Sequence, residues 1–486
     1  MKSAQNKPSD HFNNLFSKEI ILLSLLNILV VGSHAVNGYV TVTIVPSIVV
    51  DLGGREYMFW LFALFQVGSI VAGVVAGSFK NQLGSRAIFA IACAILLVGS
   101  LLGGIANNLT WVILGRGLQG IGEGMLLSLI YILLADLLPR HLLPRMFALS
   151  SVIWSVAAAA GPLFAGVMDE FISWRAAFLF NVPLVIVLLA LAWRTIPPQT
   201  TKEATQPLPI KRLALLTLGL LIMGAAGQFT TPMLLVAIIF GSLIMLSGFL
   251  WLDNKAKNRL LPKNPFGQTT IVSQCMTILF VVPIAAAAGN VYFASILRSV
   301  WGLSALQAGY SLALIAFAWT IAAWLTNTID NQRTEITMIR LGMVSYVVGQ
   351  TTAALGLFIN SLFLVCVGFV IQGAAMGTSS QFNRKAIMTH AANQERSITS
   401  GAMAPITFSG AVIGAALAGL AAQVLGLFGG APANAVFDVE VARTSGSLMM
   451  LCFAAITLIA VVVSLRLTPP LASNEHATTP QADATA

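Results

Sequence analysis

Long apolar runs repeat along nearly the whole of this 486-residue chain. A bilayer core of about 30 Å is crossed by about 20 apolar residues of α-helix, and the sequence contains fourteen such runs. Only 9% of its residues are charged, against about 25% in an ordinary soluble domain. The sequence therefore predicts an all-α polytopic membrane protein and excludes a soluble enzyme and a disordered scaffold. The expected spans are 20–46, 58–79, 87–106, 110–134, 146–168, 176–193, 213–229, 233–252, 271–296, 305–325, 336–359, 362–382, 402–425 and 447–467, of which 213–229 is the shortest.

Basic residues fall on alternate loops between these runs. Twenty-one Lys and Arg residues lie on loops that share a side with both termini, and four lie on the other loops. The positive-inside rule places the richer side in the cytoplasm, so we expect both termini to be cytoplasmic, most simply in a bacterial inner membrane. This placement also explains the net charge of +9 without nucleic acid. The four cysteines lie in apolar runs without metal-ligand spacing, so we expect no disulfide, metal or other cofactor.

Two sequence matches at a single offset indicate an internal repeat. Residues 118–124 (LQGIGEG) match 371–377 (IQGAAMG), and 161–166 (GPLFAG) match 414–419 (GAALAG), both at an offset of 253. Small residues at these spacings also serve helix packing, but the shared offset favours two related six-helix bundles with a helix pair inserted between them. Repeats of this kind are typical of secondary transporters. The expected segments are an N-terminal tail (1–18), a first bundle (19–195), a linker (196–211), the inserted pair (212–252), a second bundle (271–468) and a disordered tail (469–486).

Four motifs resemble the major facilitator superfamily, specifically its fourteen-span drug:proton antiporter branch. Residues 116–122 are similar to the proton-coupling motif of that branch, and 161–166 to its antiporter glycine–proline motif. Residues 174–183 and 301–309 resemble signatures at two later spans. The resemblance covers most of the chain and implies the major facilitator fold and proton-driven antiport.

The gating motif between the second and third spans departs from the family pattern. Its usual aspartate is Asn81 and one of its arginines is Ser85, so we expect a weakened charge latch. In the first span, Asn37 stands where the family often has an acidic residue, and in the antiporter motif Ala165 replaces a glycine. The candidate gating residues are Gly77, Asn81, Gly84, Arg86, Asp136, Arg145, Gly161 and Pro162.

Glu123 is the one acidic residue deep inside an expected span. It lies about 18 Å along the fourth span from Trp111, near the middle of the membrane, where a charged carboxylate costs about 2.5–3.5 kcal/mol on insertion scales. Arg116 precedes it by two turns on the same helix face, close enough to bias its charge. His34, in the first span, can titrate near neutral pH. These three residues are the candidates for proton coupling; the alternatives are a neutral Glu123 hydrogen-bonded to a neighbouring helix and His34 as a hydrogen-bonding strut.

Polar and aromatic residues within the spans are candidates for lining a substrate cavity, because a few polar groups among aromatics suit an amphipathic organic ligand. For each residue alone, helix packing is the alternative reading. The candidates are Asn37, Phe62, Phe65, Gln66, Trp154, Asn290, Tyr292, Trp319 and Gln372.

These features together predict a monomeric, proton-coupled exporter of a small amphipathic organic compound, surrounded by lipid and driven by the proton gradient. The sequence contains no nucleotide-binding loop or catalytic triad, so it predicts neither an ATP-driven pump nor an enzyme, and no nucleic-acid partner. Two alternatives remain open. One is a transporter, exporting or importing, of a dedicated metabolite such as a siderophore or an amino-acid-like compound. The other is a non-transporting sensor.

Overall fold

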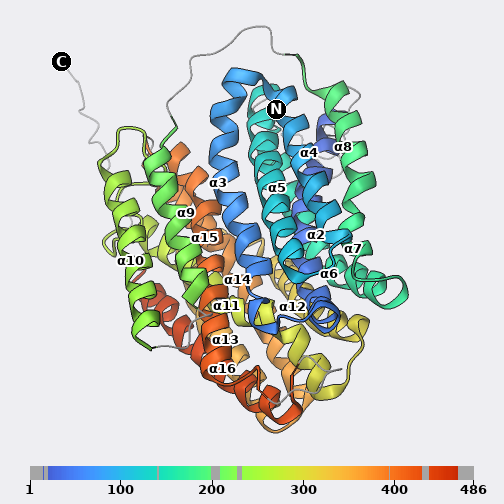
Figure 1. Ribbon diagram of the computed structural model, residues 1–486. Helices are drawn as coiled ribbons and strands as arrows, with labels where there is room; N and C mark the ends of the chain where they lie inside the picture. Colours follow the sequence, from blue (N-terminus) through green and yellow to red (C-terminus); the bar gives the residue numbers. More distant parts are fainter. Residues whose placement is uncertain are drawn as a thin grey trace, which may run out of the picture.

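The computed structural model describes residues 15, 20–138, 142–198, 208–226, 232–392, 394–429 and 437–468. Within these residues the protein is a bundle of α-helices (Figure 1). The expected tails, apart from Leu15, and most of the expected linker lie outside the described residues. The helices are α2 (Ile21–Leu52), α3 (Trp60–Leu83), α4 (Ser85–Gly104), α5 (Leu109–Leu137), α6 (Leu143–Phe171), α7 (Ala176–Leu179), α8 (Asn181–Thr195), α9 (Ile210–Ala225), α10 (Pro232–Lys255), α11 (Ile271–Trp301), α12 (Ala305–Thr326), α13 (Gln332–Phe358), α14 (Leu362–His390), α15 (Arg396–Val424) and α16 (Val439–Leu465), with a short 3-10 helix, η1 (Arg55–Tyr57).

Thirteen helical segments among the described residues are long and apolar enough to cross a membrane, with α7 and α8 together forming one of them. The fourteenth expected span coincides with α9, which has 16 described residues and is shorter than the rest. The expected span 176–193 is broken between α7 and α8. Pro183 accounts for the break, because a proline ring clashes with the carbonyl group four residues earlier, here that of Leu179.

Several helices extend beyond the apolar runs that predicted them, among them α2, α14 and α16. The first span was expected to end at residue 46, but α2 continues through Pro46 to Leu52. Helix α14 continues eight residues past its expected end, to His390. Polar contacts support this extension, since Asn383 donates to the Cys275 carbonyl group of α11 at 3.0 Å and Lys385 pairs with Glu335 of α13 at 2.6 Å.

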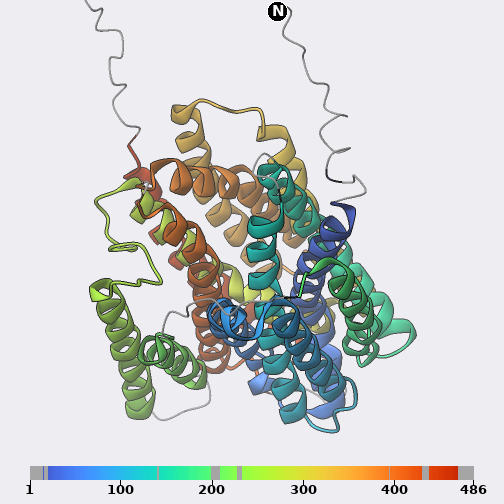
Figure 2. The same ribbon diagram turned by 90° about the horizontal axis from the view of Figure 1, so that it is seen from above.

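The helices form two halves, α2–α8 and α11–α16, and the inserted pair α9–α10 lies at the outer edge of the bundle (Figure 2). We call the end where α2 begins and α16 ends the terminal face, and the other end the opposite face. The basic residues predict that the terminal face is cytoplasmic.

Glycines let paired helices touch backbone to backbone at matching places in the two halves. A Cβ atom on Gly120 of α5 would lie 2.0 Å from the Phe65 carbonyl oxygen of α3, and one on Gly373 of α14 would lie 2.1 Å from that of Ile315 in α12. Gly124 and Gly377 make the same kind of approach one turn later, to Ser69 and Trp319. Each glycine pair is separated by 253 residues, which is the offset of the sequence repeat.

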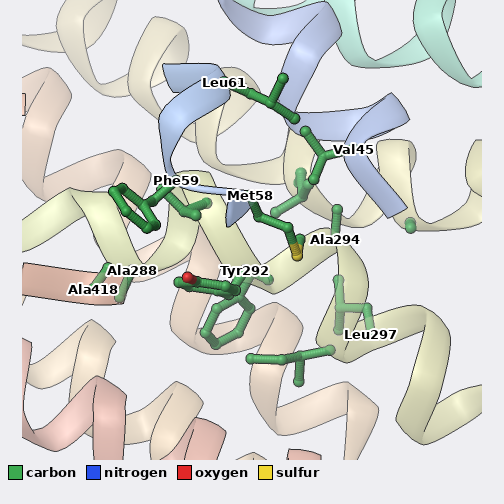
Figure 3. Packing of buried hydrophobic residues seen from close by; sticks show 14 of the residues in the cluster. Val45, Met58, Phe59, Leu61, Ala288, Tyr292, Ala294, Leu297 and Ala418 are labelled. Carbon is green, nitrogen blue, oxygen red and sulfur yellow. The ribbon is translucent and has the colours of Figure 1, made fainter. Parts of the chain in front are cut away.

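Near the opposite face, the two halves share one apolar core. Met58 and Phe59, which precede α3, pack with Tyr292 of α11 and Ala418 of α15 (Figure 3). Gly419 of α15 leaves room for the Phe59 ring, since a Cβ atom there would lie 2.7 Å from it. This packing, which continues across the seam between the halves, closes the bundle at its opposite face.

Because the Gly120 backbone contacts the Phe65 backbone, which cannot move aside as a flexible side chain could, we expect Gly120→Ala to lower the free energy of unfolding by about 1–3 kcal/mol. Gly38→Ala is the matched control, because a Cβ atom on that membrane glycine meets no atom within 4 Å. Thermal unfolding of both variants in detergent measures the effect. Equal melting temperatures for the wild type and Gly120→Ala would contradict this packing.

Candidate functional site

Glu123 lies in the middle of α5 and only 1% of its surface is exposed. Three side chains of α2 surround its carboxylate. His34 Nδ1 lies 3.1 Å from one oxygen, while Asn37 Nδ2 donates to the other at 2.5 Å and Ser33 Oγ approaches it at 3.5 Å. These contacts come from positions 33, 34 and 37, which lie within about one turn of α2, so one short stretch of a single helix holds the carboxylate.

Asn181, the first residue of α8, fixes the orientation of Asn37. The two amides exchange hydrogen bonds of 2.9 and 3.0 Å, and both side chains are buried. Because the Asn37 oxygen accepts from Asn181, its amide nitrogen faces Glu123. Sequence reasoning placed Asn181 in a family motif but did not identify it as part of this site. The one local feature that could have identified Asn181 is the helix break before α8, because this break places its polar side chain at the start of a membrane helix.

Aromatic rings enclose His34. Phe65 stacks on the imidazole with ring centroids 5.6 Å apart, Trp154 of α6 meets it edge-on at 5.7 Å, and Phe408 of α15 lies at 5.7 Å. Phe408 belongs to the second half, so the imidazole sits at the seam between the halves. The structure thus brings His34 and Asn37 to Glu123, and Phe65 and Trp154 to the His34 ring.

Arg116 is buried but does not bond to Glu123. Its guanidinium donates to the Leu61 carbonyl group at 3.1 Å and to Gln119 Oε1 at 2.9 Å, and it lies 4.0 Å from the centroid of the Phe65 ring. Gln119 in turn donates to Ser100 at 2.9 Å. Arg116 therefore joins α3, α4 and α5, and it acts on Glu123 only as a charge two turns away.

The other cavity candidates are dispersed. Gln66 is half-buried, and its Oε1 has no hydrogen-bond partner among the described residues. Gln372 packs against Gly349 of α13, and its Nε2 is likewise without a partner in that part of the chain. Tyr292 is fully buried in the core of the opposite face, so its position fits packing rather than a cavity lining. Phe62 and Trp319 are half-buried, and Asn290 is exposed on α11.

Two of the candidate gating residues, Asp136 and Arg86, make contacts within the first half at the terminal face. Lys80 pairs with Asp136 at 2.6 Å, and Arg86 donates to the carbonyl groups of Ile196 and Trp193. Gly84 ends α3 with φ of 86°, which favours glycine. Arg145 is half-buried, whereas the side-chain surroundings of Gly77 and Asn81 lie outside the described residues.

In the second half, Lys385 forms ion pairs with Asp330 at 2.7 Å and with Glu335 at 2.6 Å. The hydrogen bond that Lys385 donates holds the pKa of the Asp330 carboxyl below its usual range. Neither the pairs of Lys385 nor the Lys80–Asp136 pair joins one half to the other.

Gly161 and Pro162 mark a close crossing of helices. A Cβ atom on Gly161 would lie 2.9 Å from the Tyr39 side chain of α2. Gly309 of α12 approaches the Pro162 carbonyl oxygen so closely that a Cβ atom on it would lie 2.7 Å away. The glycine–proline motif therefore packs α6 against both α2 and a helix of the other half.

An ion pair that was not foreseen from the sequence joins the halves at the opposite face. Asp169 of α6 lies 3.4 Å from the guanidinium of Arg298 of α11. Ser47 of α2 links the two, since it donates to Asp169 at 2.5 Å and accepts from Arg298 at 2.7 Å. The next residue of α6, Glu170, accepts from Ser304 at the start of α12 at 2.9 Å.

Arg384 was counted as a loop residue but lies inside α14, two turns before its end. Its side chain is exposed, and it is close enough to Tyr39 of α2 and Tyr131 of α5 to interact with them electrostatically. In the part of the chain that the structure describes, no carboxylate lies within ion-pair distance of it. Arg384 is therefore a cation without a carboxylate counter-ion among the described residues.

The family model described as Major Facilitator Superfamily matches residues 27–414. The chain belongs to this superfamily. It is 25% identical over 402 residues to a probable multidrug-efflux transporter of Mycobacterium tuberculosis (strain H37Rv), covering 80% of this chain and 85% of that protein. It is 29% identical over 275 residues to an uncharacterized MFS-type transporter of the same strain, covering 56% of this chain but only 40% of that protein.

Solved structures of the superfamily share the fold. A peptide transporter POT in complex with sulfate has a TM-score of 0.64 at 11% identity, covering 96% of each chain. A D-xylose-proton symporter has a TM-score of 0.63 at 13% identity, covering 93% of this chain and 100% of the other. The family assignment and the helices together make this chain a multi-pass membrane member of the superfamily.

Because the Asp169–Arg298 pair joins the halves, we expect Asp169→Asn to increase the population that is open at the opposite face. Spin labels on the exposed Phe171 and Phe363 positions, one in each half, report the separation by pulsed electron paramagnetic resonance. The distance distribution should gain a longer component. Glu440→Gln is the control, because Glu440 pairs with Arg443 inside α16. An unchanged distance distribution in Asp169→Asn would show that the Asp169–Arg298 ion pair does not keep the opposite face closed.

Proposed function

We propose that this superfamily member is a proton-coupled exporter of small amphipathic organic compounds, of the fourteen-span drug:proton antiporter branch, working as a monomer by alternating access. In this proposal it lies in a bacterial inner membrane with both termini in the cytoplasm. The observation that carries the proposal is the buried Glu123 carboxylate. Among the described acidic residues, Glu123 alone lies in the middle of a helix, whereas the others lie in loops or within a few residues of helix ends.

The contacts of Glu123 suit a group that gains and loses a proton. A carboxylate in contact with an imidazole can share one proton with it. No arginine or lysine bonds to the carboxylate among the described residues, so its partners are the His34 ring and neutral donors. A substrate reaching the site would compete with the proton for the carboxylate.

Helix α2 connects the Glu123 carboxylate to the ion pair that joins the two halves at the opposite face. The residues that hold Glu123 lie at positions 33–37, and Ser47 follows about 15 Å further along the helix. Ser47 contacts both members of the Asp169–Arg298 pair. Pro46 lies between them and lacks a backbone N–H group, so α2 can bend there. In the proposed cycle, protonation of Glu123 releases its hold on α2, and α2 then shifts the ion pair.

The proton gradient supplies enough free energy for export. One proton moving inward releases about 2.3 kcal/mol per 100 mV and about 1.4 kcal/mol per pH unit. At 100 mV and one pH unit, this supports a gradient of a neutral solute of several hundredfold, since each 1.4 kcal/mol is about tenfold. The resemblance to a probable multidrug-efflux transporter supports the assignment of direction.

Glu123→Gln tests the coupling, because glutamine keeps the hydrogen-bonding shape but cannot carry the proton. In inside-out vesicles with an acidic interior, adding a transported compound to wild-type protein should release protons, which a pH-sensitive dye detects. Glu123→Gln should abolish this release while the protein still folds. Glu56→Gln, at the exposed η1, is the matched control and should behave as wild type. Proton release by Glu123→Gln at the wild-type rate would contradict the assignment.

Arg384 favours a second candidate function, the transport of a dedicated metabolite that carries an acidic group. An exposed arginine without a carboxylate partner suits a ligand carboxylate, which it can bind with two parallel hydrogen bonds. Arg384→Gln distinguishes the two functions in a substrate-competition assay. Under the second function, it should weaken the binding of anionic and amino-acid-like compounds but not of neutral amphiphiles.

A further inference from the structure

A cavity of about 770 Å³ lies to one side of the bundle, between the two halves and the inserted pair. Its lining comes from α3 and α5 of the first half, from α11 and α15 of the second half, and from α9, α10 and residues 259–266. From α5 it includes residues 124–132 and from α15 residues 398–413. Both stretches lie between the middle of the helix and the terminal face, so the cavity occupies the half of the membrane next to that face.

The inserted pair forms one wall of this cavity. Leu216 and Leu220 of α9, together with Leu246, Phe249 and Leu250 of α10, line it. The other side of the pair is also apolar but faces outward, as the exposed Leu218 and Leu243 show. The pair therefore has a lipid-facing side and a cavity-facing side.

The pair bridges the seam between the halves. Gly224 of α9 lies against the Trp60 ring of α3, where a Cβ atom would be 3.0 Å from it. Leu216, Leu220 and Phe249 share an apolar core with residues of α3 and of the second half, including Ile70 and Ile406. Polar contacts fasten the pair to the chain that follows it. Arg212 bonds to Asp253 at 2.6 Å, and the Asp253 carboxylate accepts from the backbone of Leu260 and Leu261.

The chemistry of the lining specifies the part of a ligand that fits. Its one charged side chain is Arg259, and Glu395 already pairs with it at 2.5 Å. The other polar side chains in the lining are the serine hydroxyls and Tyr131, and the rest are apolar. Cavities of this volume hold drug-sized molecules. The part of a ligand lying here is therefore apolar and uncharged.

The cavity reaches the aromatic rings that surround the partner of Glu123. Phe408 of α15 lines the cavity, and its ring centroid lies 5.7 Å from that of His34, whose Nδ1 lies 3.1 Å from the Glu123 carboxylate. A molecule with its apolar body in the cavity would therefore direct a polar group toward Glu123.

We propose that the inserted pair α9–α10 is a wall of the substrate site, and that this cavity binds the uncharged apolar body of the transported amphipathic molecule. This rests on the proposed function, because the occupant is the exported compound. It assigns the pair a role in binding, in addition to its place between the two halves.

Binding of the neutral dye N-phenyl-1-naphthylamine to the purified full-length protein tests the proposal, because the fluorescence of this dye rises in apolar surroundings. Leu220→Trp fills the cavity, since Leu220 is buried and lines it. It should weaken dye binding tenfold or more, which corresponds to about 1.4 kcal/mol. Leu218→Trp is the matched control, because this residue lies two positions away on the lipid-facing side and is 47% exposed. It should leave the affinity unchanged.

The assay uses no proton gradient, so its failure is distinct from a failure of proton coupling. If Leu220→Trp does not fold, as judged by gel filtration, Leu250→Trp replaces it. Equal dye affinity in the control and the cavity-filling variant would overturn the proposal. A phospholipid that native mass spectrometry finds bound to the wild type but not to Leu220→Trp, and that the dye cannot displace, would also overturn it by identifying a resident lipid.

Discussion

A carboxylate in the middle of a membrane helix must have partners, and much of this protein is arranged around the partners of Glu123. A charged group at this depth is energetically unfavourable. Polar contacts from α2 offset this, and they come from His34, Asn37 and Ser33. Asn181 orients the Asn37 amide, and rings from both halves enclose the imidazole. Ser47, on the same helix, contacts both members of the ion pair that joins the halves. One buried group is thus connected to the closure of the opposite face.

Close helix packing makes this arrangement possible. Gly120 and Gly124, on either side of the Glu123 position along α5, bring its backbone against that of α3. Their counterparts Gly373 and Gly377 do the same in the second half, where Met376 replaces the acidic residue. The repeat therefore preserves the packing but not the chemistry. Among the described residues, a carboxylate in the middle of a long helix therefore occurs in the first half alone.

Hydropathy and glycine spacing predicted the spans and the repeat, because the bilayer thickness and helix packing act on local sequence, and the resemblance of four short motifs indicated the superfamily. The span 213–229 was the shortest, and α9 is correspondingly short. Local sequence does not show which distant side chains meet. The Asp169–Arg298 pair and the Asn37–Asn181 exchange join residues more than a hundred positions apart. For the same reason Tyr292 was expected in a cavity but lies in the core, and the cavity beside α9–α10 was not foreseen.

Infrared difference spectroscopy of the purified protein, recorded before and after a transported compound is added, tests the central claim most directly. The carbonyl stretch of a protonated carboxyl group is visible by this method. If Glu123 exchanges its proton for substrate, the compound should reduce this band in the wild type, and the change should be absent in Glu123→Gln. A compound that binds without altering the band, or that alters it equally in the variant, would show that the coupling proton resides elsewhere.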